Sequence, residues 1–126
     1  MTKDPTLDHW YPVAMVSGLQ QPRETLLLGR PIRVEKNTKG DVTVQDGQGA
    51  SLPTVIRYGH VWTSLGTPDK DLFTIPEAET EGRALVDVGS VLVKCSPLRA
   101  VENFLDIAHF PFIHTDILGA ESHSEV

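Results

Sequence analysis

An acidic segment interrupted by a proline, residues 69–82, divides this chain into two parts and limits the core that either part can build. Its acidic residues, Asp69, Asp71, Glu77, Glu79 and Glu81, lie on both sides of Pro76. Charge and proline together are typical of an exposed connection. The remaining parts, 1–68 and 83–126, are short for independent folding without a disulfide or a metal cluster. We therefore expect their apolar faces to need another protein surface.

The hydrophobic pattern predicts an α+β chain. Apolar and polar residues alternate over 32–36 and 42–45, and turn-forming residues fill 37–41 and 46–49, so the first part predicts short strands. Residues 83–94 are rich in valine and predict one or two more strands. Ser96 and Pro97 are typical of the N-cap and first position of a helix. The stripe of that helix expected to be buried is Leu98, Val101, Leu105 and Ala108.

The end of that helix carries the pattern Asp-x-x-His-x-x-x-x-His. Asn103, Asp106 and His109 are spaced to share one helical face, and His114 follows beyond a turn. Two imidazoles in this arrangement can converge on one cation, with Asp106 orienting His109. Two histidines and a carboxylate are the usual ligands of mononuclear non-haem iron. Histidines at this spacing also occur where they only cap carbonyls or pack against neighbouring phenylalanines.

Four motifs resemble those of the Rieske non-haem iron oxygenases, in the branch of the vanillate O-demethylases and methylxanthine N-demethylases. N-F-L-D-I-A-H-F-P-F-I-H-T-D-I-L-G at 103–119 resembles the iron-site segment of that family. W-Y-P-V-A at 10–14, L-G-R-P-I at 28–32 and Y-G-H-V-W-T-S-L-G at 58–66 resemble its N-terminal motif, its next strand pair and the strand that closes its Rieske domain. The resemblance implies a mostly antiparallel β remnant of a Rieske domain over 1–68, a linker over 69–82, and strands and one helix from the start of the catalytic domain over 83–126.

The sequence departs from the family pattern at both metal centres. A Rieske cluster is held by two cysteines and two histidines, whereas this sequence has one cysteine, Cys95, and reads D-G-Q-G-A-S-L at 46–52 where the first ligand pair is expected. The resemblance places the third iron ligand, an aspartate, in the part of the catalytic domain that would follow residue 126. It therefore implies a truncated homologue, in which Asp116, Glu121 and Glu125 are poor substitutes. Cys95 is expected to be a small buried residue.

Two hypotheses follow from the resemblance. In the first, the chain is a non-catalytic structural subunit that stabilises or completes the catalytic subunit of a hetero-oligomer based on trimers. The substrate would be an aromatic or heteroaromatic methyl compound, with methylxanthines as one candidate. In the second, the chain is part of a split enzyme: His109 and His114 bind Fe(II) with a ligand from another chain, Asp106 relays electrons between subunits, and Asn103 lies behind the ligands. Both expect the [2Fe–2S] cluster on a partner, no cofactor on this chain alone, and a reductase or ferredoxin as electron donor.

Composition argues against other classes of function. The net charge is −6 and the basic residues are scattered, which disfavours nucleic acid as a partner. We find no apolar run long enough to span a bilayer and no signal peptide after Met1, so a cytoplasmic location is expected. The other histidines, His9, His60 and His123, are expected to pack or be solvated rather than to bind metal.

Overall fold

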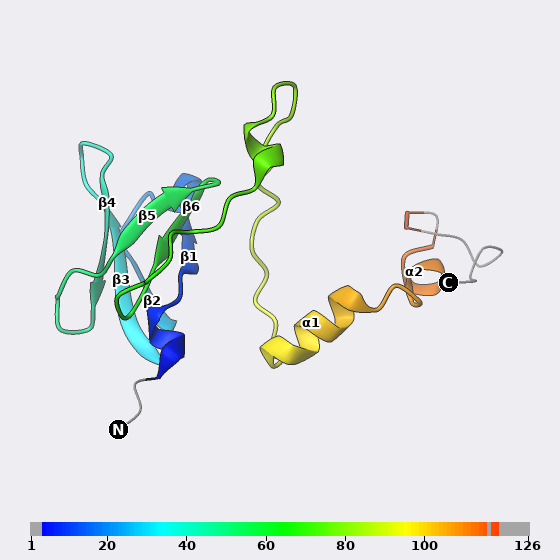
Figure 1. The fold of residues 1–126 in the computed structure, drawn as a ribbon, viewed down its shortest axis with the longest axis horizontal. Helices are drawn as coiled ribbons and strands as arrows, with labels where there is room; N and C mark the ends of the chain where they lie inside the picture. The colour runs from blue at the N-terminus through cyan, green and yellow to red at the C-terminus, as the bar shows by residue number, and fades with distance from the viewer. Residues whose placement is uncertain (1–3, 116, 119–126) are drawn as a thin grey trace. The chain divides into compact units, whose positions relative to one another are not determined.

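The computed structural model describes residues 4–115 and 117–118, and contacts divide the chain into one unit that ends at Asp87 and another that begins at Val88 (Figure 1). The first unit holds the strands β1 (Tyr11–Met15), β2 (Arg23–Leu27), β3 (Arg30–Lys36), β4 (Val42–Asp46), β5 (Thr54–Arg57) and β6 (His60–Thr63). It also holds the short 3-10 helices η1 (Pro5–Asp8), η2 (Val16–Gly18) and η3 (Pro76–Glu79). The second unit holds α1 (Pro97–Leu105) and α2 (Phe110–Ile113). The predicted α+β class is confirmed.

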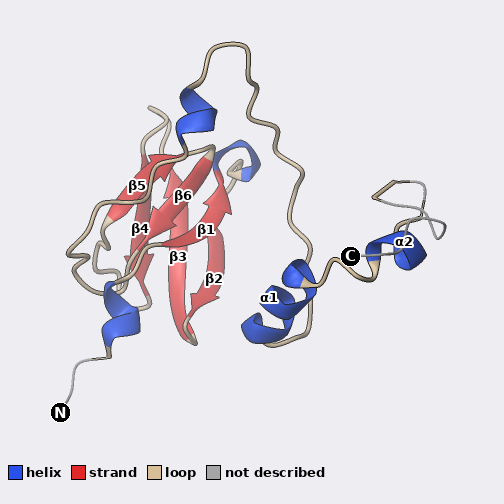
Figure 2. Ribbon diagram, turned by 45° about the vertical axis from the view of Figure 1, so that its right-hand side comes forward, coloured by secondary structure: helices blue, strands red, loops and turns tan. Residues whose placement is uncertain are grey.

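The strands form two antiparallel three-stranded sheets, in the orders β1-β6-β5 and β2-β3-β4 (Figure 2). Ile32 and Val34 of β3 are buried while Arg33 between them is exposed, as the alternation predicts, because successive side chains of a strand point to opposite faces. Both sheets supply residues to one buried apolar cluster, made of Ala14, Leu19, Leu27, Ile32, Val34, Val44 and Val61. The core of the first unit is therefore shared between the two sheets.

Two tight turns set the register of the hairpins. Leu28 and Gly29 join β2 to β3 with φ of 49° and 76°, and Tyr58 and Gly59 join β5 to β6 with φ of 55° and 71°. Two successive residues with positive φ are typical of the two-residue turn that matches the twist of antiparallel strands. The strand pair expected around residues 28–32 is thus formed, and a left-handed backbone at Tyr58 is part of the turn that precedes β6.

The chain after β6 contacts the first unit again through residues 69–75, here termed the strap. Arg57 Nη1 donates a hydrogen bond to the Leu72 carbonyl oxygen at 2.5 Å, and the Leu72 side chain is buried. The Phe73 ring meets the Trp62 ring edge-on, with centroids 5.5 Å apart. Tyr58 Oη accepts a hydrogen bond from the Ile75 amide. These contacts hold the strap to β5, β6 and the turn between them, although most of its side chains are exposed.

Three expectations for the second part of the chain are wrong. Residues 83–94 form no strand in the structure, where the strands of the described residues all lie between Tyr11 and Thr63. The α1 stripe expected to be buried is exposed, with Leu98 and Leu105 each 76% accessible. Cys95 is exposed rather than buried. All three expectations assumed a packing surface that the described part of this chain does not provide.

No helix among the described residues has the length and apolar character needed to cross a membrane.

The shared core predicts that alanine substitution destabilises the protein much more at Ile32 than at Leu26. Ile32→Ala removes a side chain that is 2% exposed, and we expect it to lower the free energy of unfolding by about 2–5 kcal/mol. Leu26→Ala is the control, because Leu26 is 68% exposed and its loss should cost roughly 0.5 kcal/mol or less. Urea unfolding followed by tryptophan fluorescence measures both, since Trp10 and Trp62 lie in the first unit. Equal destabilisation by the two variants would contradict the assigned core.

Candidate functional site

The helix α1 starts where the sequence predicts but ends earlier. Ser96 is the N-cap, its hydroxyl accepts a hydrogen bond from the Arg99 amide at 3.4 Å, and Pro97 is the first helical residue. The helix stops at Leu105, and Asp106 is the C-cap in an extended conformation. Asn103, Asp106 and His109 therefore do not share a helical face, and that expectation is wrong.

The side chain of Asp106 explains the early stop. Its Oδ1 accepts a hydrogen bond from the Ala108 amide at 2.9 Å, which forms a local turn in place of the next turn of helix. Aspartate competes with helices in this way because its short side chain can bond nearby backbone groups. Asn103 remains in the last turn of α1 and is exposed. The carboxylate predicted to orient a histidine thus also shapes the chain that carries that histidine.

The two predicted ligands lie at the two ends of the one-turn helix α2. His109 is its N-cap and His114 its C-cap, and Pro111, buried, lies in its first turn. The His114 amide donates to the Phe110 carbonyl at 3.0 Å, which closes the turn, and the two imidazole centroids lie 5.4 Å apart. The Phe110 ring contacts both, with centroids 4.9 Å from the His109 ring and 6.0 Å from the His114 ring.

The distance between the rings fits joint binding of one cation. The His109 and His114 ring centroids are 5.4 Å apart. Imidazole nitrogens bind transition metals at about 2.1 Å, which puts the centroids of two ligands on one ion about 5 Å apart. The separation of the two rings fits this geometry, and metal binding by His109 and His114 stays a prediction.

Asp106 lies beside the His109 ring. Its Oδ2 is 3.5 Å from His109 Nδ1, and the His109 side chain is 20% exposed. A carboxylate beside Nδ1 favours the tautomer with the proton on that nitrogen. The unshared electron pair that can bind a metal is then on Nε2. This is the arrangement expected of a carboxylate that orients a ligand histidine.

A third ligand is not found where the structure can be described. Among residues 4–115, 117 and 118, no three histidine, cysteine, aspartate or glutamate side chains are grouped so that they could hold a metal ion. The acids weighed as substitutes, Asp116, Glu121 and Glu125, lie outside the described residues, and so does His123. A complete iron centre would need one more ligand than the pair His109 and His114 provides.

The loop at 46–52, where the resemblance places the first pair of cluster ligands, is closed by its own hydrogen bonds. Asp46 Oδ1 accepts from the Gln48 and Ala50 amides, both at 2.9 Å. The Asp46 amide donates to the Ala50 carbonyl at 2.9 Å, and Leu52 returns to pair with Val44. Cys95, the one cysteine of the sequence, lies in the second unit. The loop is thus a compact turn between β4 and β5, built from side chains that are not cluster ligands.

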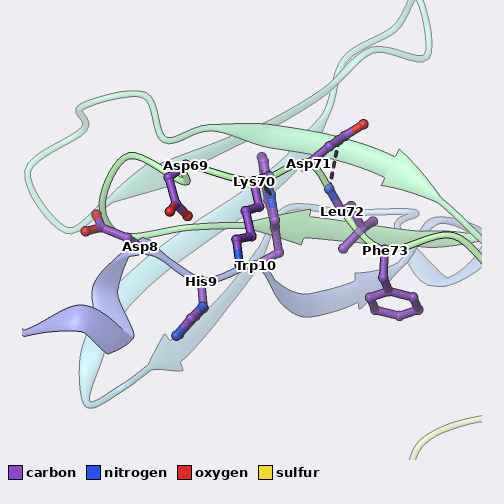
Figure 3. Close-up of a pocket in the computed structure, with 8 residues that line it drawn as sticks. All are labelled: Asp8, His9, Trp10, Asp69, Lys70, Asp71, Leu72 and Phe73. Atoms are coloured by element: carbon purple, nitrogen blue, oxygen red, sulfur yellow. Dashed lines mark hydrogen bonds between the residues drawn. The ribbon is translucent and has the colours of Figure 1, made fainter.

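The W-Y-P-V-A motif borders a surface cavity of about 450 Å³ between residues 8–10 and the strap (Figure 3). Trp10 Nε1 donates to the Lys70 carbonyl at 2.9 Å, and Asp8 Oδ1 accepts from the Thr67 amide at 2.8 Å. The motif therefore fastens the chain that leaves β6. Sequence reasoning missed Arg57 and Phe73 in this role, although an apolar pair at 72 and 73 inside an acidic segment was a usable signal.

Comparison with known proteins assigns the family. The family model of the vanillate O-demethylase oxygenase C-terminal domain matches residues 93–126, which include both histidines of the pair. The probable methylxanthine N7-demethylase NdmC of Pseudomonas sp. (strain TJI-51) is 42% identical over 125 residues. The chain is a homologue of this branch of the Rieske oxygenases. The alignment covers 95% of this chain and 43% of NdmC, so the chain spans less than half the length of that relative.

The contact between Asp106 and His109 predicts a tautomer. At a pH where the imidazoles are neutral, we expect His109 to carry its proton on Nδ1, because the Asp106 carboxylate lies beside that nitrogen. Asp106→Ala should move the population towards the Nε2-protonated form. Long-range ¹H–¹⁵N correlation spectra of the imidazoles measure the two populations. Glu102→Ala is the control, since Glu102 pairs with Arg99 instead, and an identical tautomer in all three proteins would refute the assignment.

Proposed function

We propose that this chain is a non-catalytic structural subunit of a Rieske-type demethylase hetero-oligomer. The observation that carries the proposal is the single cysteine, Cys95, because a Rieske cluster needs two thiolates and this homologue of a cluster-dependent family has one. Electrons for demethylation would then come through a cluster on another polypeptide. The chain's role is to stabilise or complete the catalytic subunit that works with that cluster.

The fold of the first unit supports this role. Its core is apolar, and every buried side-chain nitrogen or oxygen among the described residues has a hydrogen-bond partner. Thr63 and Ser64, fully buried, donate to the carbonyls of Pro53 and Leu7. A sandwich of this kind does not rely on a cluster to close it, because its loops are held by their own hydrogen bonds. It is suited to serve as a scaffold within an assembly.

The names of the relatives support a proposal for the chemistry of the assembly. The names of the matched family and protein specify a vanillate O-demethylase and a methylxanthine N7-demethylase. We propose oxidative removal of a methyl group from an aromatic or heteroaromatic compound, with methylxanthines as the first class to test. The partners would be a catalytic oxygenase subunit, in an assembly based on trimers, and a reductase or ferredoxin that donates electrons.

A second function, that of a split-enzyme subunit, is favoured by the geometry of the histidine pair. His109 and His114 would each offer a ring nitrogen to mononuclear iron, and another chain would complete the ligand set. Bound iron would supply the site at which dioxygen is activated. Asp106 would hold the proton on His109 Nδ1 and lie on the electron path from a neighbouring subunit. Asn103, three residues before Asp106, would lie next to the ligands without binding the iron itself.

Assembly tests the first function. The chain, carrying an affinity tag, is co-expressed with a catalytic demethylase subunit of this branch, and the mass of the purified complex is measured by light scattering. We expect a complex of fixed stoichiometry that is recovered in lower yield when the chain is omitted. A chain that stays monomeric and does not change the yield or stability of the catalytic subunit would exclude a structural role.

Iron content separates the two functions. For the structural subunit, the double variant His109→Ala, His114→Ala should leave the mass, the iron per complex and the turnover unchanged. For the split enzyme, the same variant should remove about one iron per chain while the complex stays assembled. His9→Ala is the matched control, because His9 lies in the first unit, away from the pair in sequence. Iron is counted by elemental mass spectrometry on the intact complex.

A further inference from the structure

The strap, residues 69–75, is held to the first unit by side chains and not by secondary structure of its own. It forms no helix and no strand, and Leu72 is its one buried residue. The other six residues of the strap are exposed. A segment with few buried apolar groups opens at a smaller free energy than the core beside it. The strap therefore has the character of an element that opens while the sheets stay folded.

Arg57, the last residue of β5, holds the middle of the strap. Its Nη1 donates hydrogen bonds to the carbonyl oxygens of Leu72 at 2.5 Å and Phe73 at 3.3 Å. Its Nη2 lies 3.6 Å from Asp71 Oδ2. The guanidinium is planar and rigid, so these three successive residues depend on one position of one side chain. Movement of any of the three away from Arg57 therefore weakens the contacts of the others.

Tyr58, the next residue, holds the end of the strap. Its hydroxyl accepts a hydrogen bond from the Ile75 amide. Its ring stacks on the Phe73 ring, with centroids 6.2 Å apart and planes at 27°. The Phe73 ring also meets the Trp62 ring edge-on, so one strap side chain contacts two aromatic rings of the first unit.

Tyr58 makes these contacts from a backbone conformation that tyrosine rarely adopts. Its φ is 55°, and it is the first residue of the turn between β5 and β6. Asparagine, aspartate and glycine are preferred at this position, because the Cβ of other residues crowds the backbone in the left-handed region. Such a conformation persists when surrounding contacts compensate for its cost. The contacts with Phe73 and Ile75 provide that compensation at Tyr58.

We propose that the strap opens and closes on the first unit as one element, and that Tyr58 is its latch. When closed, the strap forms one wall of the cavity of about 450 Å³ beside Trp10, to which it contributes residues 69–73 (Figure 3). Opening would remove that wall and uncover the apolar site that Leu72 fills. The proposal concerns the first unit alone, so it goes beyond both functions proposed above and does not rest on either.

The two tryptophans provide separate reporters of the strap and of the sheets. Trp10 Nε1 donates to the carbonyl of Lys70, which lies at the opposite end of the strap from Ile75. Trp62 Nε1 donates to the Arg57 carbonyl, within the β5–β6 hairpin, at 3.0 Å. The sequence has two tryptophans, so each indole N–H gives its own signal in ¹H–¹⁵N spectra. Faster hydrogen exchange at Trp10 alone therefore reports opening of the whole strap.

The test measures hydrogen exchange of both indole groups in the full chain carrying Tyr58→Asn. Asparagine is accepted at positive φ and gives the Asn-Gly pair preferred in this turn, so the urea midpoint of unfolding should stay equal or rise. Loss of the hydroxyl and the ring should speed exchange at Trp10 Nε1 by about 10- to 50-fold, and at Trp62 Nε1 by less than about 3-fold. Tyr58→Phe keeps the ring and should speed exchange at Trp10 by about 5-fold.

Leu28→Asn is the matched control. Leu28 has the corresponding position in the turn between β2 and β3, with φ of 49°, and that hairpin belongs to the other sheet. The substitution gives the same Asn-Gly pair at a position that is not among the strap contacts described above. Exchange at Trp10 Nε1 should therefore stay within about 2-fold of the wild type.

Each outcome supports or overturns the proposal. Faster exchange at Trp10 alone in Tyr58→Asn, with an unchanged or higher urea midpoint, supports a latch on a strap that opens independently of the sheets. Equal exchange at Trp10 in Tyr58→Asn and Leu28→Asn would overturn the latch. Equal acceleration of both indole groups in Tyr58→Asn would show that the strap opens only when the sheets unfold, and the proposal would fail.

Discussion

The apolar layer shared by the two three-stranded sheets is the contact on which the first unit depends. Val34, Val44 and Val61 come from different strands and are at most 1% exposed. Each is placed by strand register, so a slip of one residue would turn it towards solvent. The tight turns at 28–29 and 58–59 fix that register and therefore fix the layer. The loop at 46–52 and the strap attach to a body that is already closed.

The described residues of the second unit form no such apolar layer. Its described contacts are short-range in sequence: a capped helix, an aspartate turn and the one-turn helix α2. Such contacts fix local geometry but bury little apolar area, which is the main source of folding free energy. The apolar residues of α1 and of the segment at 88–94 stay exposed as a consequence. These residues are the apolar surface that the hetero-oligomer proposed above would cover.

The sequence predicted what is decided locally. Alternation placed the strands β3 and β4, turn residues placed the hairpins, and Ser96 with Pro97 placed the start of α1. The motifs predicted the family, which the comparisons confirm. Prediction from the sequence failed where the structure of a segment depends on the surface that packs against it. The expected strands at 83–94 and the burial of Cys95 both needed partners that no local pattern reveals. The end of α1 was missed because one hydrogen bond of Asp106 outweighs helix periodicity.

The uncovered helix and the histidine pair are linked through Asp106. This residue ends α1, turns the chain at Ala108 and contacts His109, so the position of α1 and the orientation of the His109 ring share one side chain. A contact that fixes α1 would therefore also restrict the direction in which His109 Nε2 points. In a split iron site, such a contact would preorganise one ligand before the missing ligand arrives, and preorganisation raises metal affinity. In a purely structural subunit the same linkage has no metal to orient, and the role of Asp106 would be to end α1.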